Sequence, residues 1–262
     1  MNVLITGAAN GIGKAVTNYF LKNNHNVYAL DIKKVEEQEN LKSYIADITN
    51  EDNLKKVKKD LEENNTKLDI IINIAGIHMM ASLVESNYNK MKKLIDINLC
   101  GTMLVNNIFH SNLTKDGRII IVTSEVAGFD PMPFNGLYNV SKTGLDCYAQ
   151  ALRQELNLIG QKVITIRPGA IKTELSNNSI TDTERLANDT ILYNNQAHKF
   201  SKIAAKFMGK PLEPIQLAKV IYRASTKKHP KLIYKKHQNI GLVLLNVLPK
   251  RLQCKIIKMI LN

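Results

Sequence analysis

The chain has 262 residues, of which 44% are apolar and 23% charged, a globular composition that provides one large α/β core and argues against a second full domain. Its formal net charge of +13 lies in the C-terminal quarter, because residues 199–262 contain 15 lysines and arginines and one acidic residue, Glu213, whereas the rest is nearly neutral. This asymmetry predicts an acidic partner, an anionic ligand or a membrane surface, and the alternative is a solvated lysine-rich face.

The sequence also limits the location of the protein and the kind of chemistry. The apolar run at 3–5 is too short for a signal peptide, and the longest apolar stretch, 240–248, is about half of the roughly 20 residues that span a membrane, so we expect a cytoplasmic protein. Three cysteines without paired spacing and six scattered histidines argue against disulfides, structural zinc and metal catalysis. Few aromatic residues interleave with the lysines, which argues against nucleic-acid binding.

Short β-type runs alternate with amphipathic helical stretches along the chain. The runs lie at 2–6, 26–30, 43–45, 70–73, 118–123 and 162–167, with a last edge strand at 231–234. Several are continuously apolar, as expected of strands buried on both faces of a parallel sheet. The alternation predicts an α/β protein of one Rossmann-type domain, a doubly wound parallel sheet with helices on both faces.

A glycine-rich turn at 6–13 joins the first strand to the first helix. Glycines there let the backbone approach a pyrophosphate, which the helix N-terminus attracts. The second strand ends at Asp31, 18 residues after Gly13, where a carboxylate accepts a hydrogen bond from a ribose hydroxyl and repels a 2′-phosphate. The sequence therefore predicts NAD in preference to NADP, although Lys33 and Lys34 weaken this preference. The alternative for Asp31 is a capping or solvated residue at a strand end.

An ordered set of short motifs resembles the short-chain dehydrogenase/reductase family over nearly the whole chain. The glycine turn matches TGxxxGxG, Asp47-Ile48 is similar to the pair that contacts adenine, and 73–76 matches the NxAG strand end. Asn98, Ser124, the YNVSK run at 138–142 and the Pro-Gly pair at 168 follow in the family's order. The resemblance implies that the cofactor is bound by Gly7, Asn10, Gly11, Ile12, Gly13, Asp31, Asp47, Ile48, Asn73, Ala75, Gly76, Tyr138, Lys142, Pro168, Gly169, Ile171 and Thr173.

Tyr138 and Lys142 are four residues apart, so on a helix they share one face. A neighbouring ammonium favours the ionised phenol, and we expect it to lower the pKa of Tyr138 from its ordinary value near 10. Tyr138 would then take the hydroxyl proton during oxidation and return it during reduction. The alternative is a tyrosine–lysine pair on a helix surface.

Ser124 follows the apolar strand residues 119–122, where its hydroxyl can stabilise charge on a substrate oxygen. Counted back from Tyr138, the family's usual spacing points to Glu125 instead. We favour Ser124, because a loop such as 129–133 absorbs an extra residue more cheaply than a buried strand does. By resemblance, Asn98 would hold a helix carbonyl and a water that relays protons to Lys142, and the alternative is a polar residue satisfied inside the core.

After residue 167 the regular rhythm weakens, and the polar stretch 173–195 predicts a mobile insertion that closes over a substrate. We expect a catalytic domain at 1–235, with a substrate loop at about 173–210, and a basic, apolar C-terminal extension at 236–262. Helical spacing in the extension predicts an interfacial helix, with Leu252, Ile256, Met259 and Ile260 on one face and Arg251, Lys255 and Lys258 along another. The alternative is a cover over the substrate cleft or a subunit interface.

Together these features predict an NAD-dependent oxidoreductase that interconverts a hydrophobic secondary alcohol and its ketone. The resemblance is nearest to the steroid and retinol branch of the family and implies a homodimer or homotetramer; the extension adds weak contact with an anionic membrane. One alternative is a 3-oxoacyl thioester reductase, whose acidic carrier would meet the basic tail, although its NADPH preference conflicts with Asp31. The other is a dinucleotide-binding protein without turnover, against which the intact Ser124, Tyr138 and Lys142 argue.

Overall fold

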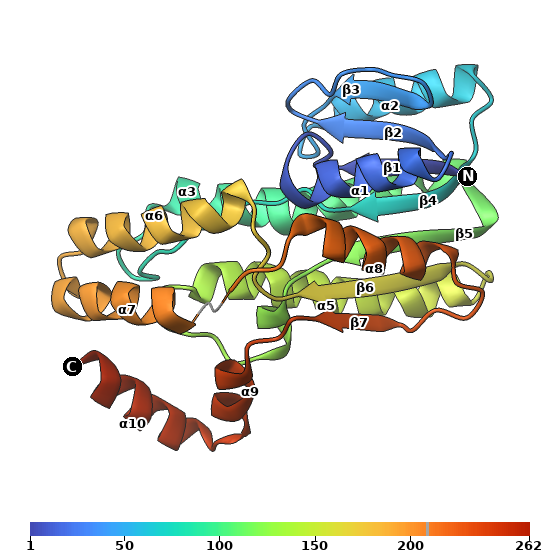
Figure 1. Cartoon of the computed structure of the whole chain (residues 1–262). Helices are drawn as coiled ribbons and strands as arrows, with labels where there is room; N and C mark the ends of the chain where they lie inside the picture. Colours follow the sequence, from blue (N-terminus) through green and yellow to red (C-terminus); the bar gives the residue numbers. More distant parts are fainter. Residues whose placement is uncertain (208–209) are drawn as a thin grey trace.

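Seven parallel strands form one sheet in the order β3-β2-β1-β4-β5-β6-β7 (Figure 1). The computed structural model describes residues 1–207 and 210–262, except for the side chains at 174–180 and 204–207. The strands are β1 (Asn2–Thr6), β2 (Asn26–Asp31), β3 (Leu41–Ile45), β4 (Leu68–Asn73), β5 (Leu113–Val122), β6 (Lys162–Pro168) and β7 (Ile233–Lys236). The strand order reverses between β1 and β4, and in such sheets ligands bind at the carboxyl ends of the strands near this point.

Helices cover both faces of the sheet. On one face lie α1 (Gly11–Lys22) and α8 (Pro214–Thr226), which pack against each other. The other face is covered by α2 (Glu51–Glu63), α4 (Thr102–Phe109) and α5 (Gly136–Asn157). The short helix α3 (Tyr88–Ile95) continues through a π-helical turn, η1 (Asp96–Gly101), into α4, and the 3₁₀ turns η2 (His110–Asn112) and η3 (Glu125–Gly128) flank β5.

The alternation of side chains along each strand builds two apolar cores. In β1, Val3 and Ile5 point toward α1 and α8, while Leu4 points toward α2 and α4, and all three side chains are fully buried. The same alternation continues through β4, β5 and β6. Strands buried on both faces read as continuous apolar runs, so the single doubly wound α/β domain predicted from the sequence is confirmed.

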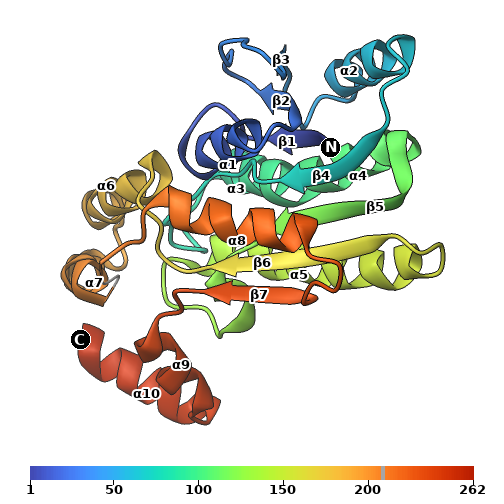
Figure 2. The same cartoon turned by 45° about the vertical axis from the view of Figure 1, so that its right-hand side comes forward.

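The insertion between β6 and α8 differs from the expectation. The stretch 173–195 was expected to be irregular, yet α6 (Glu174–Asp189) and α7 (Asn194–Phe207) form two helices beyond the carboxyl ends of the strands (Figure 2). Leu186 and Ala187 on α6 and Ala197 on α7 are buried and pack against Met80 and Phe134. These few apolar residues are hard to recognise as a core in a stretch whose composition is mostly polar.

The C-terminal extension is also helical. After β7 the chain forms α9 (Ile240–Val247) and α10 (Lys250–Leu261), which project from the main body near α7 (Figures 1 and 2). Asn239 caps α9 by accepting a hydrogen bond from the Leu242 N–H at 3.2 Å. Among the described residues, no helix combines the length and apolar character needed to cross a membrane.

Candidate active site

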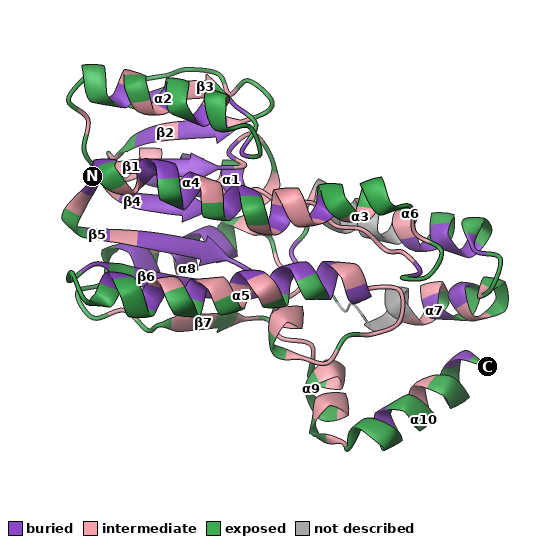
Figure 3. Cartoon of the chain, turned by 180° about the vertical axis from the view of Figure 1, so that it is seen from behind, coloured by how far each residue is buried: buried purple, intermediate pink, exposed green. Residues whose placement is uncertain are grey.

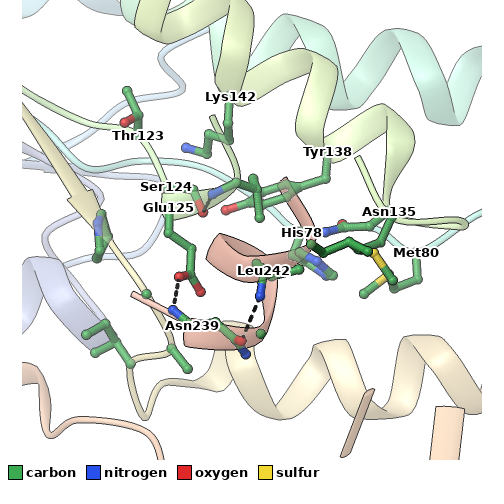
Figure 4. Close-up of a pocket in the computed structure, with 18 of the residues that line it drawn as sticks. His78, Met80, Thr123, Ser124, Glu125, Asn135, Tyr138, Lys142, Asn239 and Leu242 are labelled. Carbon is green, nitrogen blue, oxygen red and sulfur yellow. Dashed lines mark hydrogen bonds between the residues drawn. The ribbon is translucent and has the colours of Figure 1, made fainter. Parts of the chain in front are cut away.

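A cavity of about 850 Å³ lies at the carboxyl ends of β4, β5 and β6, beneath α7, α9 and α10 (Figure 4). It brings together residues that lie about 160 positions apart in the sequence: Ile12, Gly76, Ser124, Tyr138, Lys142, Pro168, Gly169, Ile171 and Thr173. The rest of its wall is mostly apolar. The carboxyl edge of the sheet therefore carries a pocket that is lined by about half of the predicted site residues, with Ser124, Tyr138 and Lys142 among them.

Tyr138 and Lys142 lie one turn apart on α5, both buried, with the Lys142 Nζ 5.9 Å from the centre of the Tyr138 ring. Ser124 follows the end of β5, and its hydroxyl lies close enough to the Tyr138 phenol to lower the pKa of that phenol. Figure 4 shows the three side chains directed toward one another on the same side of the pocket. A hydroxyl, a phenol and an ammonium thus converge on a point where a substrate oxygen can be bound.

The expected direction of the shift in the Tyr138 pKa is wrong. Burial raises the pKa of Tyr138 to about 12; the nearby Ser124 hydroxyl offsets part of this rise, and the Glu125 carboxylate adds a smaller rise. Burial also lowers the pKa of Lys142 to about 8. The sequence predicts the neighbouring ammonium but not the desolvation, which has the larger effect. At neutral pH Tyr138 is therefore a protonated phenol, suited to donate a proton.

Asn98 lies behind this group, in the π-helical turn η1, and is fully buried. Its side chain accepts a hydrogen bond from the Ile77 N–H at 2.8 Å and donates to the Ile77 carbonyl at 2.9 Å and to the Ser141 hydroxyl at 3.1 Å. The carbonyl that it holds therefore belongs to a loop, not to a helix as expected. Asn98 links the loop after β4 to α5, and so fixes the loop against the helix that carries Tyr138.

Glu125, the alternative to Ser124, faces elsewhere. Its carboxylate accepts a hydrogen bond from the Asn239 N–H at 2.6 Å, at the start of α9 (Figure 4), and burial raises its pKa. Figure 4 shows the Ser124 side chain beside the Tyr138 hydroxyl, whereas the Glu125 carboxylate is directed toward Asn239, and we therefore favour Ser124 over Glu125. Glu125 instead joins the C-terminal extension to the floor of the pocket.

The glycine-rich turn between β1 and α1 forms a cradle that side chains would fill. Gly7 has φ of +71°, and a Cβ there would lie 2.8 Å from the Ala75 Cα. A Cβ on Gly13 would lie 1.8 Å from the Gly7 carbonyl oxygen, so helix α1 can begin this close to the turn only with glycine. Gly11 adjoins Thr173, and Asn10 is the extended N-cap residue of α1. These residues fit the diphosphate of a dinucleotide.

Asp31 lies at the end of β2 beside this cradle. Its carboxylate accepts hydrogen bonds from the backbone N–H groups of Ala9 at 3.0 Å and Lys33 at 2.9 Å. The two N–H groups hold the acid where the second strand meets the glycine-rich turn. A negative group at this point would meet a 2′-phosphate with repulsion.

Three other predicted cofactor residues have contacts within the protein. The Asp47 carboxylate accepts hydrogen bonds from the N–H and hydroxyl of Thr49, and Ile48 is buried beside Gly101. Asn73 is buried and donates to the Asn106 side chain on α4 at 2.8 Å. The structure therefore gives these three side chains roles in shaping turns and joining strand to helix.

His78 is a site residue that the sequence reasoning missed. Its ring lies 4.6 Å from that of Tyr138, and its Nδ1 is 3.9 Å from the Asp182 carboxylate on α6. The sequence signal for a histidine at the site is its position two residues after the NIAG strand end, whereas the search for metal-ligand spacing among the histidines does not detect it. Within the described residues no group of three or more histidine, cysteine or acidic side chains could hold a metal ion.

Comparisons with known proteins agree with this geometry. Residues 1–184 match the family model described as short chain dehydrogenase. The chain is 29% identical over 199 residues to the NADPH-dependent 1-acyldihydroxyacetone phosphate reductase of Schizosaccharomyces pombe, covering 73% of this chain and 67% of that one. It is 24% identical over 230 residues to the 3-ketodihydrosphingosine reductase of Bacteroides thetaiotaomicron, covering 87% and 84%. A crystal structure of a short chain dehydrogenase family protein from Francisella tularensis superposes with a TM-score of 0.77 at 25% identity, covering 92% and 98%.

Proposed function

The chain belongs to the short-chain dehydrogenase/reductase family and is an oxidoreductase, and on this basis we propose that it interconverts a hydrophobic secondary alcohol and its ketone with NAD as cofactor. One observation carries the proposal: Ser124, Tyr138 and Lys142 converge in an apolar pocket that adjoins a glycine cradle at the same edge of the sheet. The first group supports proton transfer, and the second supports binding of a dinucleotide.

The proposed roles follow from the contacts. Ser124 hydrogen-bonds the substrate oxygen, Tyr138 donates its phenolic proton to that oxygen as the carbonyl is reduced, and Lys142 stabilises the phenolate that remains. A bound nicotinamide supplies the hydride in this direction and accepts it in the other. Because burial raises the pKa of Tyr138 to about 12, the phenol is protonated at neutral pH and can donate its proton to the substrate oxygen.

The choice of NAD rests on Asp31, whose carboxylate is fixed beside the cradle by two backbone N–H groups. The S. pombe relative is named as NADPH-dependent, so cofactor choice differs within the family and must be read from this chain's own residues. The measurement is the ratio of kcat/KM with the two cofactors.

The class of substrate rests on the pocket wall. Leu242 and Leu245 on α9, Leu248 just after it, and Ile256 and Ile257 on α10 line the pocket together with Tyr138. Burying a hydrocarbon chain against such a wall contributes roughly 25 cal/mol per Å². The two named relatives are reductases of ketone substrates, which supports the same reaction type.

The test is a substrate panel of steroid, retinoid, 3-oxoacyl thioester and short-chain carbonyls with NADH or NADPH, read by loss of reduced-cofactor absorbance. Preference for an apolar ketone with NADH supports the proposal. Preference for the thioester with NADPH would favour the alternative reductase, and NADH binding without any turnover would favour a dinucleotide-binding protein. We further propose a cytoplasmic homodimer or homotetramer, for which Met103 on α4 and Val140 on α5 offer exposed apolar area.

A further inference from the structure

The rim of the pocket is apolar and open to solvent. Leu244 and Val247 on α9 and Ile260 on α10 line the cavity, and they are also exposed by 65%, 79% and 47%. Through these three residues the apolar lining of the cavity reaches the outer surface of α9 and α10.

Further apolar side chains extend the rim over the outside of the two helices. Ile240, Leu252 and Met259 are exposed and do not line the cavity. Figure 3 shows exposed residues on both α9 and α10. We call the six residues Ile240, Leu244, Val247, Leu252, Met259 and Ile260 the apolar rim. The four apolar residues expected on one face of α10 differ in their surroundings. Ile256 and Ile260 line the cavity with Ile257, whereas Leu252 and Met259 do not line it and are exposed. The extension therefore covers the cleft with one face and exposes an apolar surface with the other.

Cations accompany the apolar rim, and acidic residues do not. Arg251, Lys255 and Lys258 are exposed on α10 beside the rim. The sequence contains no acidic residue after Glu213, so nothing on α8, β7, α9 or α10 offsets these charges. Lys250 is an exception, since it pairs with Asp130 of the loop after β5.

We infer that the apolar rim and the cations of α10 dock on an anionic lipid bilayer, so that substrate enters the cavity from the membrane. Apolar side chains bury in the acyl boundary while lysines and arginines contact anionic headgroups. A second copy of the chain is a poorer occupant, because a symmetric interface would bring the cations of both copies together without acids to pair with them. The docking stands on the surface alone, and the route of the substrate rests on the proposed function.

The first experiment is vesicle co-sedimentation of the full chain with equal parts phosphatidylglycerol and phosphatidylcholine, or with phosphatidylcholine alone. We expect binding to the anionic vesicles that weakens as salt rises, and little binding to the neutral ones. Neutralising three cations in Arg251→Gln/Lys255→Gln/Lys258→Gln should reduce partitioning roughly 100-fold. The matched control is Lys55→Gln/Lys56→Gln/Lys59→Gln on the distant helix α2, which makes the same charge change and should bind as wild type.

The apolar contribution is tested by Ile240→Ser/Leu252→Ser/Met259→Ser, which leaves the cavity wall intact. Thermal unfolding shows whether each variant is folded, and light scattering reports its oligomeric state. The triple serine variant should lose vesicle binding, keep its activity on a water-soluble ketone, and lose activity on a ketone presented in anionic vesicles.

Three results would overturn the inference. The first is equal binding of the wild type to neutral and anionic vesicles, and the second is a loss of vesicle binding in the α2 control that equals the loss in the α10 variant. The third is conversion of an oligomer to monomers by the serine variant. The last result would assign the apolar rim to a second copy. Activity on the water-soluble ketone is a separate readout: its absence in wild type would refute the proposed function, while vesicle binding would still decide the docking.

Discussion

Ser124 and Glu125 are adjacent, and the structure predicts different effects for the two substitutions. Ser124→Ala removes the hydroxyl that lies beside the Tyr138 phenol and that we propose contacts the substrate oxygen. Loss of one donor to a developing oxyanion costs about 2.7–4 kcal/mol in the transition state, so kcat should fall roughly 10²–10³-fold with little change in KM.

Glu125→Ala should act mainly on KM. It removes the acceptor of the Asn239 N–H, a contact of 2.6 Å that holds the start of α9 over the pocket, so an apolar ketone should bind less tightly. Glu125→Gln, which keeps an acceptor oxygen, should restore most of the loss. Steady-state kinetics with one apolar and one short-chain ketone would separate the effects. A larger fall in kcat for Glu125→Ala than for Ser124→Ala would refute the assignment of Ser124.

Three further outcomes follow from the charges in the structure. Asp31→Ala should lower the ratio of kcat/KM for NAD over NADP roughly 10-fold or more, and an unchanged ratio would show that Asp31 is not beside the ribose. For ketone reduction, kcat/KM should be flat below about pH 8 and fall above it, because Lys142, whose pKa burial lowers to about 8, loses its charge as pH rises; a rise there would contradict this. Asp146→Ala should cost about 3 kcal/mol in urea unfolding, because it leaves the largely buried Arg167 without its carboxylate partner, whereas Lys55→Ala, in an exposed pair, should change stability far less.

The sequence predicts the sheet well because its signals are local. The central strands contain short apolar runs, and seven strand segments with intervening amphipathic stretches allow few other topologies. The glycine turn is equally local. Gly7 and Gly13 are needed there because a Cβ atom on either residue would collide with neighbouring backbone. The edge strand β7 shifts by two residues, from the expected 231–234 to Ile233–Lys236, because an edge strand has one partner to fix its register.

Features that depend on distant parts of the chain could not be read in the same way. The pKa of Tyr138 depends on desolvation by loops and helices that assemble only in the fold, so the spacing to Lys142 gave the wrong direction. The inward face of α10 is set by the position of the cavity, which the helical periodicity alone does not fix. The approach of His78 to Asp182, at 3.9 Å, joins residues about 100 positions apart and leaves no local pattern.

Tyr138→Phe tests the central claim most directly. The substitution removes the phenolic oxygen and keeps the buried ring against His78, so the fold and NADH binding should be nearly unchanged. NADH affinity is measured by fluorescence titration and kcat by reduced-cofactor absorbance with the best ketone of the panel. We predict wild-type affinity for NADH and a kcat lower by about 10²–10⁴-fold. A variant that retains more than about a tenth of the wild-type kcat would contradict the role of Tyr138 as the proton donor.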